Sequence, residues 1–388
     1  MTGALSHIKV VDVTAARAGP SCVRILADLG ASVIQVVRPA AGGVDSGLPG
    51  ADRENLHRNK RSMSLDLQQA KGKDIFLRLI EDADVLVENF RPDVKYRLGI
   101  DYDTLSKLNP RLVYGSISGF GQDGPWGPRP GVDQIAQGMG GLMSITGPPG
   151  GGPWRVGIAI CDLAAGMYLA HGIMAALLER EQSGQGQWVK TSLLEACVAL
   201  LDFQAARWLI DGEVPGQAGN DHPTVFPTGV FPTRDGSINI AATGDRAFNN
   251  FAAAIGLPDL PNDERFANGR ARARNREALR AVCEEKTREF GSEELVEKLN
   301  EAGVPSGLIL TIDQVFANPQ VQHLQMAAAV ESPRGAMNLV RPAFNLSRTP
   351  PSVRTAAPAS GEHTREILQE LGISDADAEE LSAAGVIP

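Results

Sequence analysis

The sequence predicts an α/β protein with two parts, a large domain built on a parallel sheet flanked by helices and a smaller α+β domain. Short β-branched runs alternate with helical segments over the first hundred residues, which is typical of parallel sheets. The composition then changes at a linker rich in Gly, Pro and Asn, at residues 212–227. The length of 388 residues is sufficient for two or more domains.

Each strand of the large domain is predicted from a short apolar run. The runs are residues 7–13, 32–37, 84–88, 112–116 and 187–192. Helices are predicted at 19–29 and 73–81, and Pro20 suits a first helical turn because its missing N–H costs little there. A right-handed crossover is expected where two such strands flank a helix.

The elements after the linker are shorter and more mixed. Strands at 230–232 and 237–242 are joined by a turn at 234–236. The remaining predictions are a charged helical segment at 272–299, a strand at 303–310, a hairpin of 326–330 with 337–340, and a last helix at 364–371.

Composition and absent motifs exclude several classes of protein. The net charge is −9 without a basic run, which disfavours nucleic acid as a partner. The four cysteines form no CxxC pair, so neither a zinc site nor a disulfide framework is indicated. Neither GxGxxG nor GxxxxGK(S/T) occurs. The first residues lack the layout of a signal peptide, so we expect a cytoplasmic protein.

Asp162 is the only formal charge in the apolar run 156–178, and a buried carboxylate is costly without a partner. A membrane span needs about 20 apolar residues, but Asp162 and His171 interrupt this run. A second interpretation is a buried strand at 155–160 followed by a long helix that Asp162 caps. A third is a nucleophile or base at the ligand edge of an α/β sheet. The second and third interpretations are compatible.

A Gly- and Pro-rich stretch, 119–152, precedes this run, and loops of such length are usually functional or mobile. Within it, the segment GMGGLMS (138–144) could approach a ligand closely or could serve helix packing. A long helix at 193–209 is predicted after the Asp162 helix.

Eight segments together resemble one family, the class III CoA-transferases (CaiB/BaiF), which include formyl-CoA transferase. Each segment alone is a weak signal, whereas their joint order over nearly the full length is specific. The segments are RAGPSCVRILADLGASVIQVVRP (17–39), NKRSMSLDL (59–67), DVLVENFRPDVKYRLGI (84–100), SGFGQDGP (118–125), GIAICDLAAGMYLAHGI (157–173), HPTVFPTGVFPTRDG (222–236), GVPSG (303–307) and GEHT (361–364).

The resemblance implies a large Rossmann-like domain made from both ends of the chain. Its N-terminal part would span residues 1–210, followed by a linker at 211–228, a small α+β domain at 229–325 and a return to the large domain at 326–388. It also implies a homodimer of two interlocked ring-shaped chains.

The resemblance also implies the residues of the site. Asp162 aligns with the family's catalytic aspartate, and no metal or tightly bound cofactor is expected. The positions that would contact CoA are Arg17, Arg38, Asn59, Lys60, Asn89, Phe90 and Arg97. Formyl-CoA transferase has glutamine at the position of Arg17. A CoA-contacting lysine of that enzyme has no counterpart in the aligned residues 129–131.

In this interpretation the Asp162 carboxylate is a covalent nucleophile that moves CoA from an acyl-CoA to a small carboxylic acid. Backbone N–H groups at 138–141 or 243–245 are candidates for stabilising the oxyanion. Arg155 and Arg17 could pair with a distal carboxylate, which favours succinyl-CoA as donor. Oxalate, formate and carnitine-type acids remain open.

Three alternatives compete with this interpretation. An α-methylacyl-CoA racemase needs a histidine where this chain has Val132, and valine cannot transfer a proton. A non-catalytic CoA-binding protein would not need Asp162. An oxidoreductase that uses NAD or NADP is disfavoured because the turn after the first strand lacks the glycine fingerprint.

Overall fold

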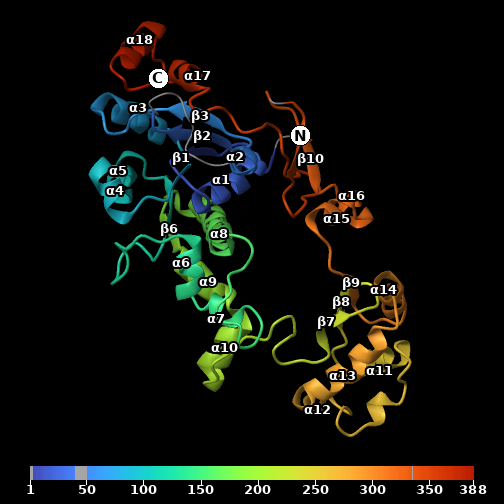
Figure 1. The fold of residues 1–388 in the computed structure, drawn as a ribbon. Coiled ribbons are helices and arrows are strands. Elements are labelled where there is room, and N and C mark those ends of the chain that lie inside the picture. The colour runs from blue at the N-terminus through green and yellow to red at the C-terminus, as the bar shows by residue number, and fades with distance from the viewer. Residues whose placement is uncertain (1–2, 40–49, 334) are drawn as a thin grey trace. The chain divides into compact units, whose positions relative to one another are not determined.

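The computed structural model describes residues 3–39, 50–333 and 335–388 (Figure 1). The chain divides into two compact units. Unit 1 comprises Met1–Leu142, Arg155–Leu209 and Gln320–Pro388, and unit 2 comprises Met143–Trp154 and Ile210–Pro319. Each unit is described by itself.

Unit 1 is built on a six-stranded sheet in the order β3-β2-β1-β4-β5-β6. Each neighbouring pair is parallel, which confirms the predicted α/β class. The strands are β1 (Lys9–Asp12), β2 (Ser32–Val37), β3 (Arg61–Ser64), β4 (Val85–Glu88), β5 (Val113–Ser118) and β6 (Trp188–Ser192). This is the strand order of dinucleotide-binding folds. Successive strands are added on one side of β1 up to β3, and from β4 onward they are added on its other side.

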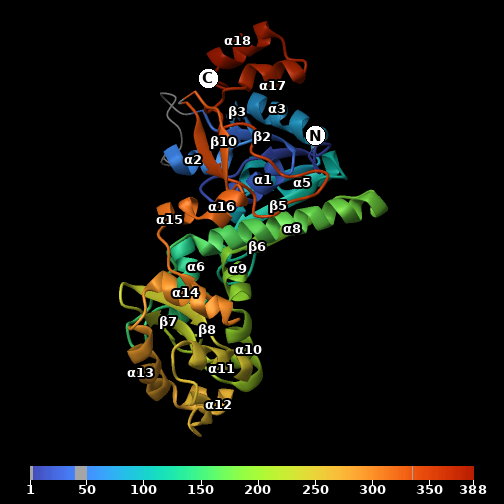
Figure 2. The same ribbon diagram turned by 90° about the vertical axis from the view of Figure 1, so that its right-hand side faces the viewer.

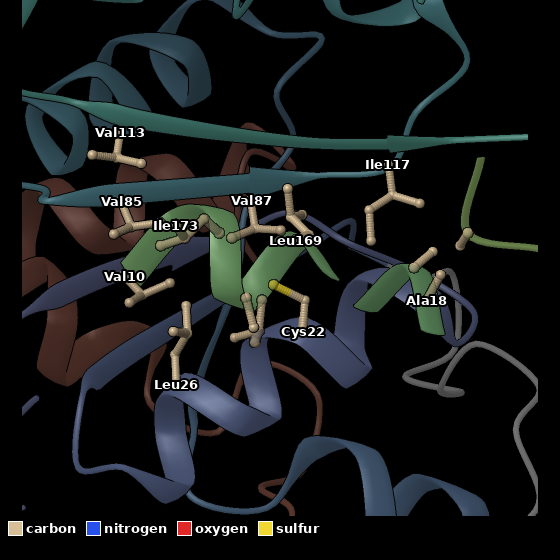
Figure 3. Close-up of a cluster of buried hydrophobic side chains, with 14 of the residues drawn as sticks. Val10, Ala18, Cys22, Leu26, Val85, Val87, Val113, Ile117, Leu169 and Ile173 are labelled. Carbon is tan, nitrogen blue, oxygen red and sulfur yellow. The ribbon is translucent and has the colours of Figure 1, made fainter. Parts of the chain in front are cut away.

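Helices cover both faces of the sheet. One face packs against α1 (Ala18–Asp28) and α8 (Ile160–Ser183), and Figure 3 shows Cys22, Leu169 and Ile173 among the strand valines of this core. The other face packs against α3 (Ala70–Glu81), α5 (Tyr102–Leu108), α17 (Thr364–Glu370) and α18 (Asp375–Ala383). Figure 1 shows α17 and α18 beside α3 and β3, so the end of the chain completes this second core.

The remaining elements of unit 1 are short helices and one hairpin. The helices include α2 (Gly50–His57), α4 (Pro92–Leu98), α6 (Asp133–Met139), α9 (Leu193–Leu200) and α16 (Pro319–His323). The predicted hairpin is confirmed as the antiparallel pair β10 (Ala327–Val330) and β11 (Met337–Val340).

α8 is the one helix in the described part of the chain that is long and apolar enough to cross a membrane. Half of the helix's most apolar 18-residue window is buried inside the protein. Figure 2 shows α8 running along the sheet with α1 above it. Leu169, Ala170 and Ile173 are buried in the sheet core, so packing in unit 1 accounts for this face of the apolar run.

Three local predictions are wrong. Residues 155–159 form no strand, because the backbone N–H of Val156 and the carbonyl of Ile158 bond to the Gln137 side chain and not to a neighbouring strand. Asp162 does not cap α8, because Ala159 is the N-cap and Asp162 lies in the first turn. The helix predicted at 193–209 is two helices, α9 and α10 (Asp202–Asp211), separated where Asp202 has a φ of 45°.

Unit 2 contains a three-stranded antiparallel sheet in the order β7-β8-β9. Its strands are β7 (Thr228–Pro232), β8 (Ser237–Ala241) and β9 (Ser306–Leu308). Its helices are α7 (Leu142–Ile145, at the boundary with unit 1), α11 (Asp245–Ala254), α12 (Gly269–Arg274), α13 (Arg276–Thr287), α14 (Ser292–Glu301) and α15 (Ile312–Ala317), with a 3₁₀ turn at Leu260–Asn262. Phe231, Phe248 and Phe251 are fully buried in its core.

Candidate active site

A cavity of about 420 Å³ lies at the carboxyl ends of the strands of unit 1. Thr14, Ala15 and Ala16 follow β1, Arg38 follows β2 and Phe90 follows β4, and all five line it. The cavity is therefore at the point where the strand order reverses, which is the usual ligand site of an open α/β sheet.

The turn after β1 is shaped by Asn89 and not by glycine. The Asn89 side chain accepts a hydrogen bond from the Ala15 N–H (2.9 Å) and donates one to the Ala15 carbonyl (2.7 Å). The next residue, Ala16, has a φ of 58°, in the left-handed region. Asn89 therefore supports the backbone that leads into Arg17 and α1.

Asn59 and Lys60 lie inside unit 1 and are engaged in internal contacts. Lys60 Nζ is 2.8 Å from Asp12 Oδ2, and both side chains are fully buried. Asn59 donates to Asp28 and accepts from the backbone N–H groups of Arg354 and Thr355. Both residues line a second cavity, of about 470 Å³, together with Arg354 and Thr355, and neither lines the first cavity.

Arg38, Phe90 and Arg97 have different surroundings. Arg38 is exposed at the cavity, and Phe90 is half-buried against the core below it. Arg97 is on α4 and is 69% exposed, with Asp93 as its ion-pair partner at 3.8 Å. The residues of α4 that line the cavity are Val94 and Leu98.

Asp162 is half-buried in the first turn of α8. Burial and the nearby Asp133 carboxylate raise the pKa of Asp162 to about 6, and Arg17 opposes this shift. Arg17 is the N-cap residue of α1 and forms an ion pair with Asp52. At neutral pH the Asp162 carboxylate is mostly ionised and is more basic than an ordinary aspartate.

Sequence reasoning missed two residues of α6 that hold the start of α8. Asp133 accepts the Cys161 N–H at 2.9 Å and a hydrogen bond from Gln137 at 2.7 Å. Asp133 Oδ2 is also 3.6 Å from the guanidinium of Arg155. The spacing of Asp133 and Gln137, one helical turn apart after Pro130 and Gly131, is the signal that could have indicated them.

The two glycine segments proposed for the oxyanion belong to different units. In unit 1, a Cβ on Gly140 would lie 2.5 Å from Cys197 Sγ, so this glycine allows α6 to approach α9 closely. In unit 2, Gly244 is the N-cap of α11, and a Cβ there would meet no atom within 4 Å. The contacts of Gly140 support the helix-packing interpretation of the 138–144 segment.

A family model and several known proteins match this chain over nearly its whole length. Residues 5–364 match the model of CoA-transferase family III. A succinate–glutarate CoA-transferase of Agrobacterium fabrum is 37% identical and is covered over 95% of each chain. A succinyl-CoA:mesaconate CoA-transferase of Haloarcula marismortui is 36% identical over 96% of this chain and 97% of its own.

A solved structure has the same fold over nearly the whole chain. The crystal structure of a CaiB/BaiF family protein from Brucella suis has a TM-score of 0.84 and 34% identity, over 96% of this chain and 100% of its own. The sequence match and the structural match both extend over nearly the whole length. The chain therefore belongs to CoA-transferase family III, and it is a CoA-transferase that uses acyl-CoA as substrate.

Proposed function

We propose that the protein transfers CoA from succinyl-CoA to a second dicarboxylic acid through covalent intermediates on Asp162. The observation that carries this proposal is the half-buried, ionisable Asp162 carboxylate in the first turn of α8, with a pKa of about 6 and Arg17 nearby. A carboxylate that is partly removed from water and still ionised at neutral pH is suited to nucleophilic attack.

In the first half of the reaction the Asp162 carboxylate attacks the thioester carbonyl of succinyl-CoA. The C–S bond breaks, the CoA thiolate leaves, and a mixed anhydride of Asp162 and succinate forms. The thiolate then attacks the aspartyl carbonyl and expels succinate as a carboxylate. This step leaves CoA as a thioester on Asp162.

In the second half the acceptor carboxylate attacks the aspartyl thioester and releases the thiolate. A new mixed anhydride joins Asp162 to the acceptor acid. The thiolate attacks the acceptor's acyl carbon, which frees the new acyl-CoA and restores the Asp162 carboxylate. The negative charge of each tetrahedral intermediate needs hydrogen-bond donors close to the thioester oxygen.

We place the adenosine diphosphate portion of CoA in the 420 Å³ cavity. Arg38 offers a cation to a phosphate, and Phe90 offers a ring face to the adenine. Asn89 shapes the adjoining turn, and Lys60 acts indirectly through Asp12, which also accepts hydrogen bonds from Thr14 in the cavity lining. Asn59 lines the second cavity and has no role in this one. Arg97 is exposed on the neighbouring helix and is free to contact a phosphate from outside the cavity.

The preference for dicarboxylic acids is supported by Arg155. Its side chain is 46% exposed and is held near Asp133, whose other oxygen bonds to the turn that carries Asp162. A distal carboxylate of the substrate could pair with this guanidinium. The Agrobacterium and Haloarcula relatives are named for reactions that pair succinate or succinyl-CoA with a second dicarboxylate.

Replacing Arg155 with Met is expected to raise the KM for succinyl-CoA by roughly tenfold, because a charge-assisted hydrogen bond contributes about 1.5–3 kcal/mol. The KM for acetyl-CoA, which has no distal carboxylate, should change little. Steady-state kinetics with both donors measure the difference. Equal changes for the two donors would contradict the role of Arg155 in binding the distal carboxylate.

We further propose that the protein binds a second copy of itself and forms a homodimer. Large apolar side chains remain exposed on α8 and α10, including Tyr168, Leu178, Trp208 and Leu209. Trp208 and Leu209 are neighbours on α10, and contiguous exposed apolar side chains commonly mark interfaces between proteins. Light scattering after size exclusion is expected to give twice the chain mass of 41.2 kDa, and a monomer mass would oppose the proposal.

The covalent step is tested by trapping. The protein is incubated with succinyl-CoA, treated with hydroxylamine and digested, and the peptides are analysed by mass. We expect a hydroxamate on Asp162, because hydroxylamine attacks activated aspartyl carbonyls and leaves free carboxylates unchanged. Unlabelled Asp162 in a preparation that catalyses CoA transfer would rule out the proposed intermediates.

A further inference from the structure

We propose that Asp133 is a positioning residue that fixes both the α8 turn carrying Asp162 and the guanidinium of Arg155. This inference rests on the proposed function of Asp162. Asp133 is 7% exposed and lies in the first turn of α6. Its two carboxylate oxygens face two different parts of the site.

The first oxygen completes the N-terminus of α8. The first N–H groups of a helix have no partner within the helix, and a side-chain oxygen usually accepts one of them. The N-cap residue here is Ala159, which has no such oxygen. Asp133 Oδ1 supplies it from another helix by accepting the Cys161 N–H at 2.9 Å. Asp162 is the next residue, so its backbone is fixed by this bond.

The second oxygen is shared by Gln137 and Arg155. Gln137 is fully buried and donates to Asp133 Oδ2 at 2.7 Å and to the Ile158 carbonyl at 3.3 Å. Its own oxygen accepts the Val156 N–H at 2.9 Å. α6 therefore holds both the irregular segment 156–159 and the first turn of α8. This segment has no neighbouring strand and depends on these bonds.

The contact of Arg155 with Asp133 also sets the charges of the site. The guanidinium lies 3.6 Å from Asp133 Oδ2 and 3.4 Å from the Ile158 carbonyl, with about half of the side chain exposed. The negative charge of Asp133 thus holds a cation in place for substrate, and it adds to the larger effect of burial in raising the pKa of Asp162. A more basic carboxylate is a better nucleophile.

Two substitutions separate these effects. Asp133→Asn keeps an oxygen for the Cys161 N–H but removes the charge and the acceptor that Gln137 and Arg155 share, whereas Asp133→Ala also removes the acceptor of the Cys161 N–H. We expect kcat to fall roughly tenfold in the first variant and roughly a hundredfold in the second, because small displacements of a reacting group are costly. Asp123→Asn, at an 88% exposed surface position, is the matched control and should keep its activity.

The pH profile distinguishes positioning from a general structural defect. Two charged groups act on Asp162, Asp133 from α6 and Arg17 from the start of α1. The acid limb of kcat/KM is expected near pH 6 in the unmodified protein. Without the negative charge of Asp133, the pKa of Asp162 falls, and the limb should move to lower pH in Asp133→Asn. Arg17 is present in both proteins and does not account for a difference.

The outcomes separate this inference from the proposed function. If Asp162 of the unmodified protein is not trapped by hydroxylamine, the proposed function fails. If it is trapped and both Asp133 variants keep the original kcat and acid limb, the positioning role is wrong. Amide hydrogen exchange gives a measurement independent of activity. The Cys161 amide should exchange at least roughly tenfold faster in Asp133→Ala, and an unchanged rate would overturn the inference.

Discussion

Asp162→Asn is expected to abolish CoA transfer, with a loss of at least roughly 10³-fold in kcat, because it removes the proposed nucleophile. The amide cannot form the mixed anhydride, so hydroxylamine should yield no hydroxamate at this position. The substitution preserves the shape of the side chain. Binding of CoA, which we propose to occupy the cavity next to Arg38 and Phe90, should therefore persist.

The same substitution should stabilise the fold at neutral pH. The pKa of Asp162 is about 6 in the folded protein, against 3.8 for an ordinary aspartate, so ionisation costs the folded state free energy. This cost appears as pH rises from about 4 to about 6 and is fully present above that range. Asparagine does not ionise, so we expect a gain of about 1–2 kcal/mol at pH 7.5, after a discount for partial exposure.

Thermal unfolding at pH 4 and pH 7.5 measures this gain. The melting temperature of Asp162→Asn should exceed that of the unmodified protein at pH 7.5, and the two should nearly coincide at pH 4. Asp103→Asn, in the first turn of α5, is the control and should change neither activity nor the pH dependence of stability. Retained activity in Asp162→Asn would refute the covalent mechanism.

Lys95→Met is expected to lower the free energy of unfolding by about 3–5 kcal/mol, because it leaves a buried carboxylate without its cation. Lys95 Nζ is 2.9 Å from Glu88 Oε1, and both side chains are fully buried. Glu88 also accepts bonds from the Ser116 hydroxyl and the Phe90 N–H. This network lies at the end of β4, directly below the Phe90 turn of the cavity.

Denaturant unfolding measures the loss. The double variant Glu88→Gln with Lys95→Met should recover part of it, because the buried charge is removed along with its partner. Lys9→Met is the matched control, since Lys9 and Asp82 form an ion pair whose side chains are 56% and 77% exposed. Lys9→Met should lower the free energy of unfolding by less than about 1 kcal/mol. A small effect of Lys95→Met would show that water reaches Glu88.

Periodicity in the sequence predicted most of the sheet and failed where the local signal was polar or broken. β2 was predicted at its observed bounds because its residues are mostly apolar and β-branched. β3 reads Arg-Ser-Met-Ser and was missed as a strand, since its place in the sheet comes from pairing with β2 and not from composition. The break between α9 and α10 at Asp202 has no proline or glycine to mark it.

Some residues of the candidate site were predicted and others were missed, for a similar reason. Asp162 stood out because it is a lone charge in an apolar run. Asn59 and Lys60 belong to a motif but bond internally, with partners 293–296 and 48 residues away in the sequence. Asp133 and Gln137 acquire their roles only when α6 packs beside the start of α8. Such tertiary contacts leave no periodic pattern in the sequence.

The return of the chain's end to unit 1 has a consequence for synthesis on the ribosome. Ile367, Leu368, Leu381 and Ile387 bury one face of the sheet, yet they are made after all the residues of unit 2. Until they emerge, the apolar residues of α3 and the neighbouring strands lack this cover, while the residues of unit 2 are already complete. Unit 1 is thus begun before unit 2 and finished after it, and the nascent chain must avoid aggregation throughout that interval.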